Sequence, residues 1–190
     1  QKNYTLIHAG CLCWNNEGFI LPAWSNTGKS STVLSLLKKH SYLKFVSEDF
    51  SMTDGRYIYN YTIFPIEKQQ AFLPLPFITR YKIKKDVPIK KKCEPKYLFL
   101  LKRSTERSIK KLDKKEALKN VMLSSLHGLG SVFFDSFLAA YSYAKANFNI
   151  FELLEKEKRI FRKLVNRVDC YEIKNPDKDF SPLIEKIIKF

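Results

Sequence analysis

Residues 23–31 have the types and the spacing of a loop that binds phosphate. The segment Ala-Trp-Ser-Asn-Thr-Gly-Lys-Ser-Ser lies between the apolar run 19–21 and a helical pattern that begins near Ser30. In a strand–loop–helix of this kind, backbone N–H groups surround the anion and the helix N-terminus adds its dipole. Lys29 would bind the β- and γ-phosphates of a nucleotide, and the Ser30 hydroxyl would ligate Mg²⁺.

Seven consecutive residues of this loop are the ones that we expect to bind nucleotide. They are Ser25, Asn26, Thr27, Gly28, Lys29, Ser30 and Ser31. The full Walker A pattern has glycine where Ala23 stands, so the pattern holds at three of its four fixed positions. An ordinary strand-to-helix turn with a solvated lysine is the alternative. The strand before the loop and the helix after it favour phosphate binding over that alternative.

Two acidic residues follow the next predicted strand, 42–46. These are Glu48 and Asp49. A strand–helix–strand crossover predicts strands that run in parallel, and ligands gather at the carboxyl ends of such strands. We therefore expect both acids beside the phosphate loop, where a general base and a Mg²⁺ ligand belong. The alternative is an exposed strand end that caps a helix.

Four features occur in order along the first third of the chain. They are His8-Ala9-Gly10 in a predicted strand, a turn at 15–18, the loop at 23–31 and the pair Glu48-Asp49. Together they resemble the kinase domain of HPr kinase/phosphorylase, whose P-loop fold is shared with phosphoenolpyruvate carboxykinase. The resemblance covers about residues 4–66. It implies transfer of a phosphoryl group from ATP, with Mg²⁺, to a hydroxyl of a peptide, a protein or a small molecule.

The resemblance also implies a role for each matching residue. Lys29 would hold the phosphates, and Ser30 and Asp49 would bind Mg²⁺. Glu48 would be the catalytic base, and His8 would line the phosphate pocket. From the residues themselves, a histidine in an apolar strand is equally well explained as a hydrogen-bonded core side chain.

The chain departs from the family pattern at three positions. Ala23 and Asn26 replace glycines of the loop. Glu48 replaces an aspartate, and its side chain is one methylene longer than that of aspartate. A Gly/Pro/Arg-rich segment like the one with which HPr kinases engage HPr is also missing from the sequence. We therefore expect nucleotide binding and an acceptor other than HPr. The alternative function is a nucleotide-dependent regulatory or binding module with weak NTPase activity.

A basic, proline-rich connector is predicted over residues 65–96. Its five prolines exclude a long helix, and lysines surround them. Arg80 in this connector is a candidate phosphate contact. Arg103, which follows the apolar central strand 97–101, is another, because a parallel strand would end at the same edge as the acids. A solvated loop is the alternative for any single lysine.

The hydrophobic periodicity predicts a single α/β domain over 1–190, with a mixed central sheet, flanking helices and a mainly helical part over 114–190. We expect the P-loop kinase fold of the HPr kinase and carboxykinase type. Predicted strands cover 4–8, 11–14, 19–21, 42–46, 57–61, 97–101, 108–112 and 170–173, and predicted helices cover 30–40, 114–126, 131–146, 150–165 and 180–188. Because the chain begins at Gln1 without a methionine, we expect it to be part of a longer protein.

Composition limits the partners and the compartment. Lysine and arginine exceed aspartate and glutamate by 15, which favours anionic ligands such as nucleotides. No RNP, zinc or helix-turn-helix signature points to nucleic acid. No apolar run approaches the roughly 18 residues that span a bilayer, so we expect no membrane association. Four cysteines without CxxC spacing favour a reducing cytosol and argue against structural zinc. Homo-oligomerisation is left open.

Overall fold

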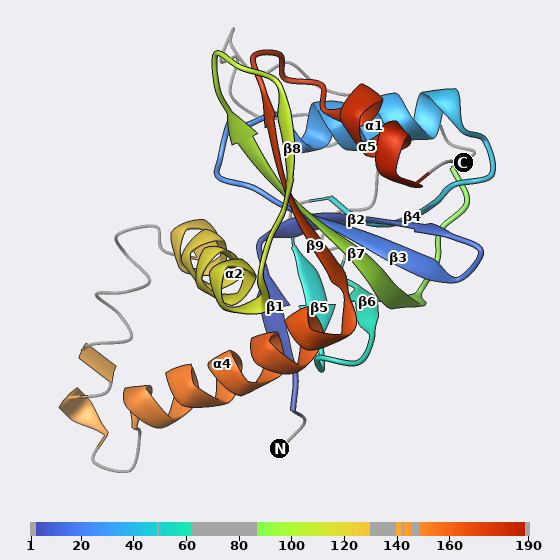
Figure 1. Ribbon diagram of the computed structural model, residues 1–190. Coiled ribbons are helices and arrows are strands. Elements are labelled where there is room, and N and C mark those ends of the chain that lie inside the picture. The colour runs from blue at the N-terminus through green and yellow to red at the C-terminus, as the bar shows by residue number, and fades with distance from the viewer. Residues whose placement is uncertain are drawn as a thin grey trace, which may run out of the picture.

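The computed structural model describes residues 3–48, 50–61, 87–129, 140–141, 143–145 and 149–188, apart from the side chains of 127–129. Over these residues the protein is a mixed α/β structure, with a mostly antiparallel sheet between two pairs of helices (Figure 1). The strands are β1 Thr5–Ile7, β2 Ala9–Trp14, β3 Glu17–Pro22, β4 Lys44–Ser47, β5 Ser51–Thr53, β6 Ile58–Asn60, β7 Lys92–Arg103, β8 Ser108–Lys111 and β9 Asp169–Asn175. The helices are α1 Lys29–Lys39, α2 Lys114–Leu129, α4 Ile150–Arg167 and α5 Ser181–Ile188.

The sheet brings the carboxyl ends of four strands, β3, β4, β7 and β9, to one edge. Its order is β1-β5-β6-β7-β3-β2-β4, and β9 pairs with both β7 and β8. Strands β3 and β9 run parallel to β7. Strand β2 is antiparallel to both β3 and β4, so β3 and β4 run in the same direction with β2 between them. The predicted direction of the strand–helix–strand unit is therefore confirmed.

A tight turn joins β2 to β3 and returns the chain toward the phosphate-loop candidate. Asn15 and Asn16 have φ angles of 46° and 69°. Positive φ at both central residues is the signature of a type I′ turn, which matches the twist of the flanking strands, and asparagine adopts this conformation more readily than most residues. The hairpin expected from Asn15–Gly18 is confirmed.

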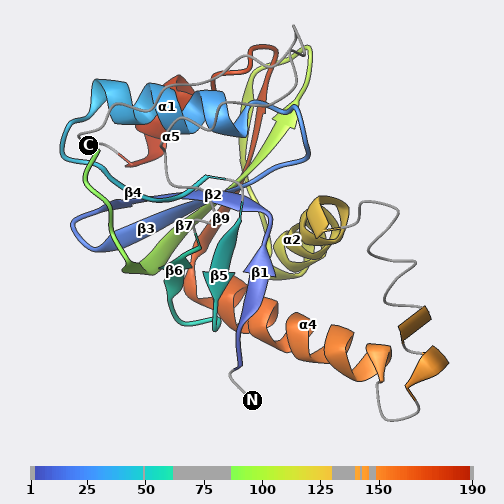
Figure 2. The ribbon, with the colours of Figure 1, turned by 180° about the vertical axis from the view of Figure 1, so that it is seen from behind.

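Helices cover both faces of the sheet. Helices α1 and α5 lie on one face and α2 and α4 on the other, as the two opposite views show (Figures 1 and 2). Side chains of strand β2 pack in both cores, because successive side chains of a strand point to opposite faces of the sheet. Leu12 packs in the core beneath α1 and α5, whereas Cys11 and Cys13 pack in the core beneath α2 and α4. Cys11 and Cys13 therefore share one face of β2.

The predicted connector 65–96 was too long at its C-terminal end. Strand β7 begins at Lys92, and the preceding residues bridge to β4 through Phe45 and Ile89. Pro95 is tolerated inside β7 because it lies opposite Gly18, next to a shift of register that removes the need for a regular ladder bond. Ile89 and residues 92–96 therefore belong to the sheet and are not part of a loop.

The other boundaries shift by a few residues. Helix α2 continues to Leu129 where we predicted an end after residue 126. A glycine inside a helix costs only about 1 kcal/mol relative to alanine, so Gly128 does not stop it. Strand β4 begins at Lys44, because Tyr42 belongs to the turn after α1.

Several predicted features lie outside the described residues. They are Asp49, Arg80, the connector from 65 to 86 and most of the predicted helix 131–146. Among the helices that the structure describes, none combines the length and the apolar character needed to cross a bilayer.

Candidate phosphate-binding site

The loop between β3 and α1 follows directly from its sequence. Ala23 is fully buried and bridges Leu101 of β7, so the chain stays extended until the sheet ends. The backbone N–H of Thr27 then donates to the carbonyl of Trp24 at 3.2 Å and closes a turn. Gly28, with φ of 121°, redirects the chain into α1. Only glycine adopts this φ without strain.

The two loop departures from the family pattern are compatible with the loop backbone. Asn26 has φ of 62°, which is the left-handed conformation that a glycine would supply and that asparagine tolerates. Ala23 does not have a positive φ and is buried in a strand-like position. A glycine is therefore not required at either position for the chain to form this turn.

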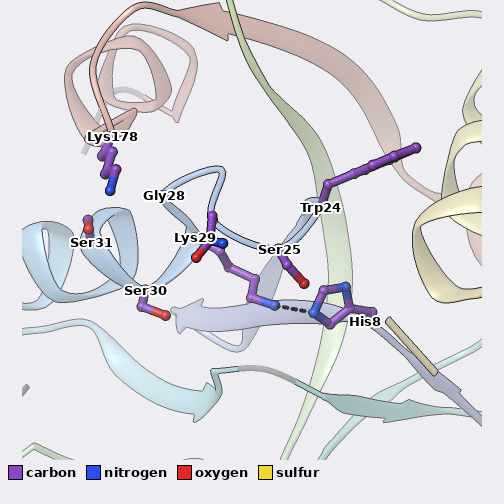
Figure 3. Close-up of a pocket in the computed structure, with 9 residues that line it drawn as sticks. His8, Trp24, Ser25, Gly28, Lys29, Ser30, Ser31 and Lys178 are labelled. Carbon is purple, nitrogen blue, oxygen red and sulfur yellow. Dashed lines mark hydrogen bonds between the residues drawn. The ribbon is translucent and has the colours of Figure 1, made fainter. Parts of the chain in front are cut away.

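Lys29 and His8 form a buried pair at the floor of the loop. Each residue is only 6% exposed, and Lys29 Nζ lies 2.9 Å from His8 Nε2 (Figure 3). An ammonium group can only donate, so Nε2 is the acceptor. His8 is therefore neutral, with its proton on Nδ1, whenever Lys29 is charged. The pair holds the Lys29 ammonium in one position next to the loop.

His8 reaches this position because the chain changes partners there. Strand β1 ends at Ile7 and pairs with β5, whereas β2 begins at Ala9 and pairs with β3 and β4. His8 occupies the bend between them and lies against the ring of Phe50, with 5.3 Å between ring centroids. The predicted strand 4–8 is thus the shorter strand β1, and His8 lies at its junction with β2.

A pocket of about 290 Å³ opens over this loop (Figure 3). It is lined by His8, Trp24, Ser25, Asn26, Gly28, Lys29, Ser30, Ser31 and Lys178. Six of the seven predicted nucleotide-binding residues are in this set. Thr27 is the exception, because its side chain is buried beneath the loop. The lining combines two ammonium groups, hydroxyl groups and a helix N-terminus, which together suit an anion with several oxygens.

The carboxyl end of β4 approaches the same loop. A Cβ atom at Gly10 would lie 3.0 Å from the carbonyl oxygen of Glu48 and 3.4 Å from Cγ of Lys29. Gly10 therefore lies between the backbone of Glu48 and the side-chain stem of Lys29, close to both. The Glu48 side chain is partly buried and does not line the pocket, and Asp49 is outside the described residues.

Of the two arginines proposed as phosphate contacts, the structure describes only Arg103. Arg103 ends β7, which runs parallel to β3 as expected, but its side chain is exposed and does not line the pocket. Strand β7 extends past the level at which β3 gives way to the loop, and this extension separates Arg103 from the pocket. Arg80 lies outside the described residues.

Sequence reasoning missed Lys178 and Trp24. Lys178 belongs to the loop after β9, which runs parallel to β7 and so ends at the same edge as β3. The rule that ligands gather at the carboxyl ends of parallel strands would have found Lys178, had it been applied to the last strand. Trp24 lines the pocket although it is 54% exposed, and no spacing rule indicates it.

Helix α2 supports the site from the opposite face of the sheet. The buried hydroxyl of Ser124 lies 3.5 Å from the carbonyl oxygens of His8 and Ala23, and it donates toward both. These two carbonyls belong to the bend that carries the histidine and to the start of the loop. Ser124 therefore links the two segments that bring His8 and Lys29 together.

The cysteines lie away from the pocket. All four are buried free thiols, and the hydrogen bond that Cys13 donates to Cys93, together with burial, raises the pKa of Cys13 far above its ordinary value. Burial raises the pKa of Cys170 to about 11. A protonated thiol is a poor nucleophile and a poor metal ligand. Within the described ranges, no cluster of three or more histidine, cysteine or acidic residues could hold a metal ion.

No protein-family model matches this chain, and the search of curated proteins finds no match either. What the site can do therefore follows from its own residues.

Proposed function

We propose that this chain is an ATP- and Mg²⁺-dependent kinase that transfers a phosphoryl group to a hydroxyl, with the P-loop kinase fold of the HPr kinase and carboxykinase type. The observation that carries the proposal is the buried Lys29–His8 pair in the pocket that opens over the loop between β3 and α1. Burying an ammonium group is unfavourable unless charged or polar groups compensate it. A phosphate bound in the loop would add an opposite charge to the contacts that the Lys29 ammonium already makes.

The loop supports binding of a polyphosphate. Helix α1 opens at Lys29, and no acidic side chain lies in its first turn. The first N–H groups and the helix dipole therefore face a position that suits an anion. In P-loops the lysine reaches the β- and γ-phosphates, which assigns this role to Lys29.

Ser30 is the described residue that would hold Mg²⁺. Its hydroxyl lines the pocket next to Lys29, as the P-loop arrangement requires (Figure 3). The second ligand proposed from the sequence is Asp49. When bound, the cation would neutralise charge on the transferred phosphoryl group.

Glu48 is the proposed base. In the transfer step the acceptor hydroxyl oxygen forms a bond to the γ-phosphorus and the bond from that phosphorus to the β–γ bridging oxygen breaks. The proton of the hydroxyl passes to the Glu48 carboxylate. The nearness of the end of β4 to the Lys29 stem supports this role for the Glu48 carboxylate.

The test is incubation with γ-labelled ATP, Mg²⁺ and a panel of hydroxyl acceptors that includes serine peptides and small polyols. We expect label transfer by the parent protein. Transfer should fall at least about tenfold in Lys29→Ala, because a charge-assisted contact to phosphate is worth about 1.5–3 kcal/mol. Glu48→Gln should retain nucleotide binding and lose transfer, since the amide cannot accept the proton.

Lys38→Ala is the matched control, because it removes the same charge from an exposed position of the same helix. Label released only as free phosphate, in a manner that depends on Lys29, would favour the nucleotide-dependent module with weak NTPase activity. Parent protein that binds no nucleotide would contradict both functions.

A further inference from the structure

The loop after β9 lies directly on the phosphate-loop candidate. A Cβ atom placed on Gly28 would come within 2.1 Å of the carbonyl oxygen of Lys178 and 2.8 Å of its Cα. The two backbones are thus in contact without any side chain between them. Figure 3 shows the Lys178 side chain extending from this loop over the start of α1.

Hydrogen bonds hold the backbone around Lys178 in place. The Thr32 hydroxyl accepts the N–H of Phe180 at 3.0 Å and donates to the carbonyl of Gly28 at 2.9 Å. The Ser35 hydroxyl donates to the Asp179 carboxylate at 2.7 Å. The side-chain amide of Asn175 donates to the carbonyl of Asp179 at 2.7 Å. The base of the Lys178 side chain is therefore fixed relative to the first two turns of α1.

The two acidic residues beside Lys178 in the sequence, Asp177 and Asp179, have other partners. Asp177 is paired with Arg107 at 2.6 Å, and Asp179 accepts from Ser35 and from the N–H of Ser181. Within the residues that the structure describes, Lys178 makes no ion pair. A lysine on a fixed loop, lining a pocket and free of acidic partners, is placed to bind an anion.

The two lysines lie at opposite ends of the pocket. Lys29 points toward His8, whereas the side chain of Lys178 ends near Ser31 on the far side of the loop (Figure 3). In a P-loop the lysine of the Gly-Lys-Ser triplet reaches the β- and γ-phosphates, while backbone N–H groups hold the α- and β-phosphates. The end marked by Ser31 and Lys178 is then the end toward the nucleoside.

We infer that Lys178 binds the α-phosphate of a nucleoside diphosphate or triphosphate. A single phosphate ion would bind in the loop without contacting Lys178. This inference rests on the proposed function and adds to it the direction in which the nucleotide lies. The reacting phosphoryl group is at the His8 end and the nucleoside is at the Lys178 end.

The test is a comparison of ligands that differ in length. Trp24 lines the pocket, so its fluorescence reports binding once the second tryptophan is removed by Trp14→Phe. In that background, Lys178→Gln should raise the Kd for ADP and for Mg-ATP about 10- to 100-fold, the range for a charge-assisted contact. The Kd for inorganic phosphate should change by less than about twofold, because that ion is held by the loop and Lys29.

Two further variants make the comparison specific. Lys186→Gln removes the same charge from an exposed position of α5 and should leave all three affinities unchanged. Lys178→Arg should restore ADP affinity to within a few-fold of the parent. Circular dichroism and the unfolding midpoint of Lys178→Gln check that the fold is retained.

Several outcomes would overturn the inference. Unchanged ADP affinity in Lys178→Gln, with Lys29→Ala abolishing binding, would reject the role of Lys178 and leave the proposed function intact. An equal loss for phosphate and ADP would reject the assignment to the α-phosphate. A parent protein that binds neither ADP nor Mg-ATP would overturn the proposed function and this inference together.

Discussion

The two faces of the sheet are held together in different ways. Both have apolar cores, but the polar contacts lie in different places. Between α2 and α4 they are at the rim, where the ammonium of Lys114 donates to the carbonyl of Val165 at the end of α4. Between α1 and the loop before α5 they lie next to the pocket and pass through the hydroxyls of Thr32 and Ser35.

This difference separates stability from the geometry of the site. Apolar packing is non-directional, so the core beneath α2 and α4 supplies free energy of folding without setting angles, and the Ser124 hydrogen bonds to His8 and Ala23 are its directional contacts with the site. Hydrogen bonds are directional, so the α1 and α5 face can set the position of the loop and of Lys178. Substitutions in the core beneath α4 should therefore have the largest effect on the free energy of unfolding. Substitutions between α1 and the loop before α5 should have the largest effect on ligand affinity.

The largest effect on stability is expected at Phe161. This side chain is 2% exposed in the core beneath α4. Phe161→Ala should lower the free energy of unfolding by about 3–5 kcal/mol, because it removes buried apolar area and leaves a cavity. Chemical denaturation measures this change. Phe151→Ala on the same helix is the control: Phe151 is 75% exposed, and its truncation should change stability by less than about 0.5 kcal/mol.

A smaller effect on stability, with a specific effect on binding, is expected at Thr32. Thr32→Val keeps the shape but leaves the buried N–H of Phe180 without its acceptor, which should cost about 1–3 kcal/mol. Nucleotide affinity should also fall, although Thr32 does not line the pocket. Thr32→Ser keeps the hydroxyl and should retain the affinity. Normal affinity in Thr32→Val would show that the hydrogen bonds beneath α5 do not set the loop.

Asp54 is an exception to this comparison, because its carboxylate makes directional hydrogen bonds on the side of the sheet that α4 covers. Its turn joins β5 to β6 and lies near Ile160 (Figures 1 and 2). The Asp54 carboxylate accepts the N–H groups of Arg56 and Tyr57 at 2.8 and 2.7 Å. Partial burial would raise the pKa of Asp54, but these N–H groups outweigh it, so the pKa lies below its ordinary value.

Asp54→Ala should therefore destabilise the protein by about 1–2 kcal/mol at neutral pH, and nucleotide affinity should be unchanged. A depressed folded-state pKa contributes stability that is present above the unfolded-state pKa, near 3.8, and is lost as pH falls through the lower folded value. The stability gap between Asp54→Ala and the parent should shrink over that acidic range. Unfolding curves at a series of pH values measure the gap; a constant gap would contradict the ionic contribution.

The smallest effect is expected for the thiols, which all belong to the core beneath α2 and α4. The native protein should react with an aromatic disulfide reagent only as fast as it opens, because all four thiols are buried and the raised pKa values of Cys13, Cys93 and Cys170 keep these three protonated. Saturating nucleotide should slow this reaction only through global stabilisation. Rapid labelling of the native protein would show that this core is loosely packed.

The sequence predicted the elements well wherever local chemistry decides them. The turn at Asn15 and Asn16 follows from their tolerance of positive φ, and α1 follows from glycine and the apolar period after it. The Asp113 carboxylate accepts the N–H of Glu116 and caps α2, which is the local role that aspartate favours before a helix. Errors appeared where tertiary partners decide, as at the start of β7, which the pairing with β6 extends into a proline-containing segment.

The loop at 23–31 was determined by the sequence itself, because a buried strand, a turn and a helix start are local consequences of residue type. The Lys29–His8 pair and the place of Lys178 were decided only by the tertiary structure. His8 is 21 residues from its partner and Lys178 is 150 residues from Gly28. Contacts across such separations depend on strand order and direction, which bring distant strand ends to one edge, and residue spacing along the chain carries no record of that order.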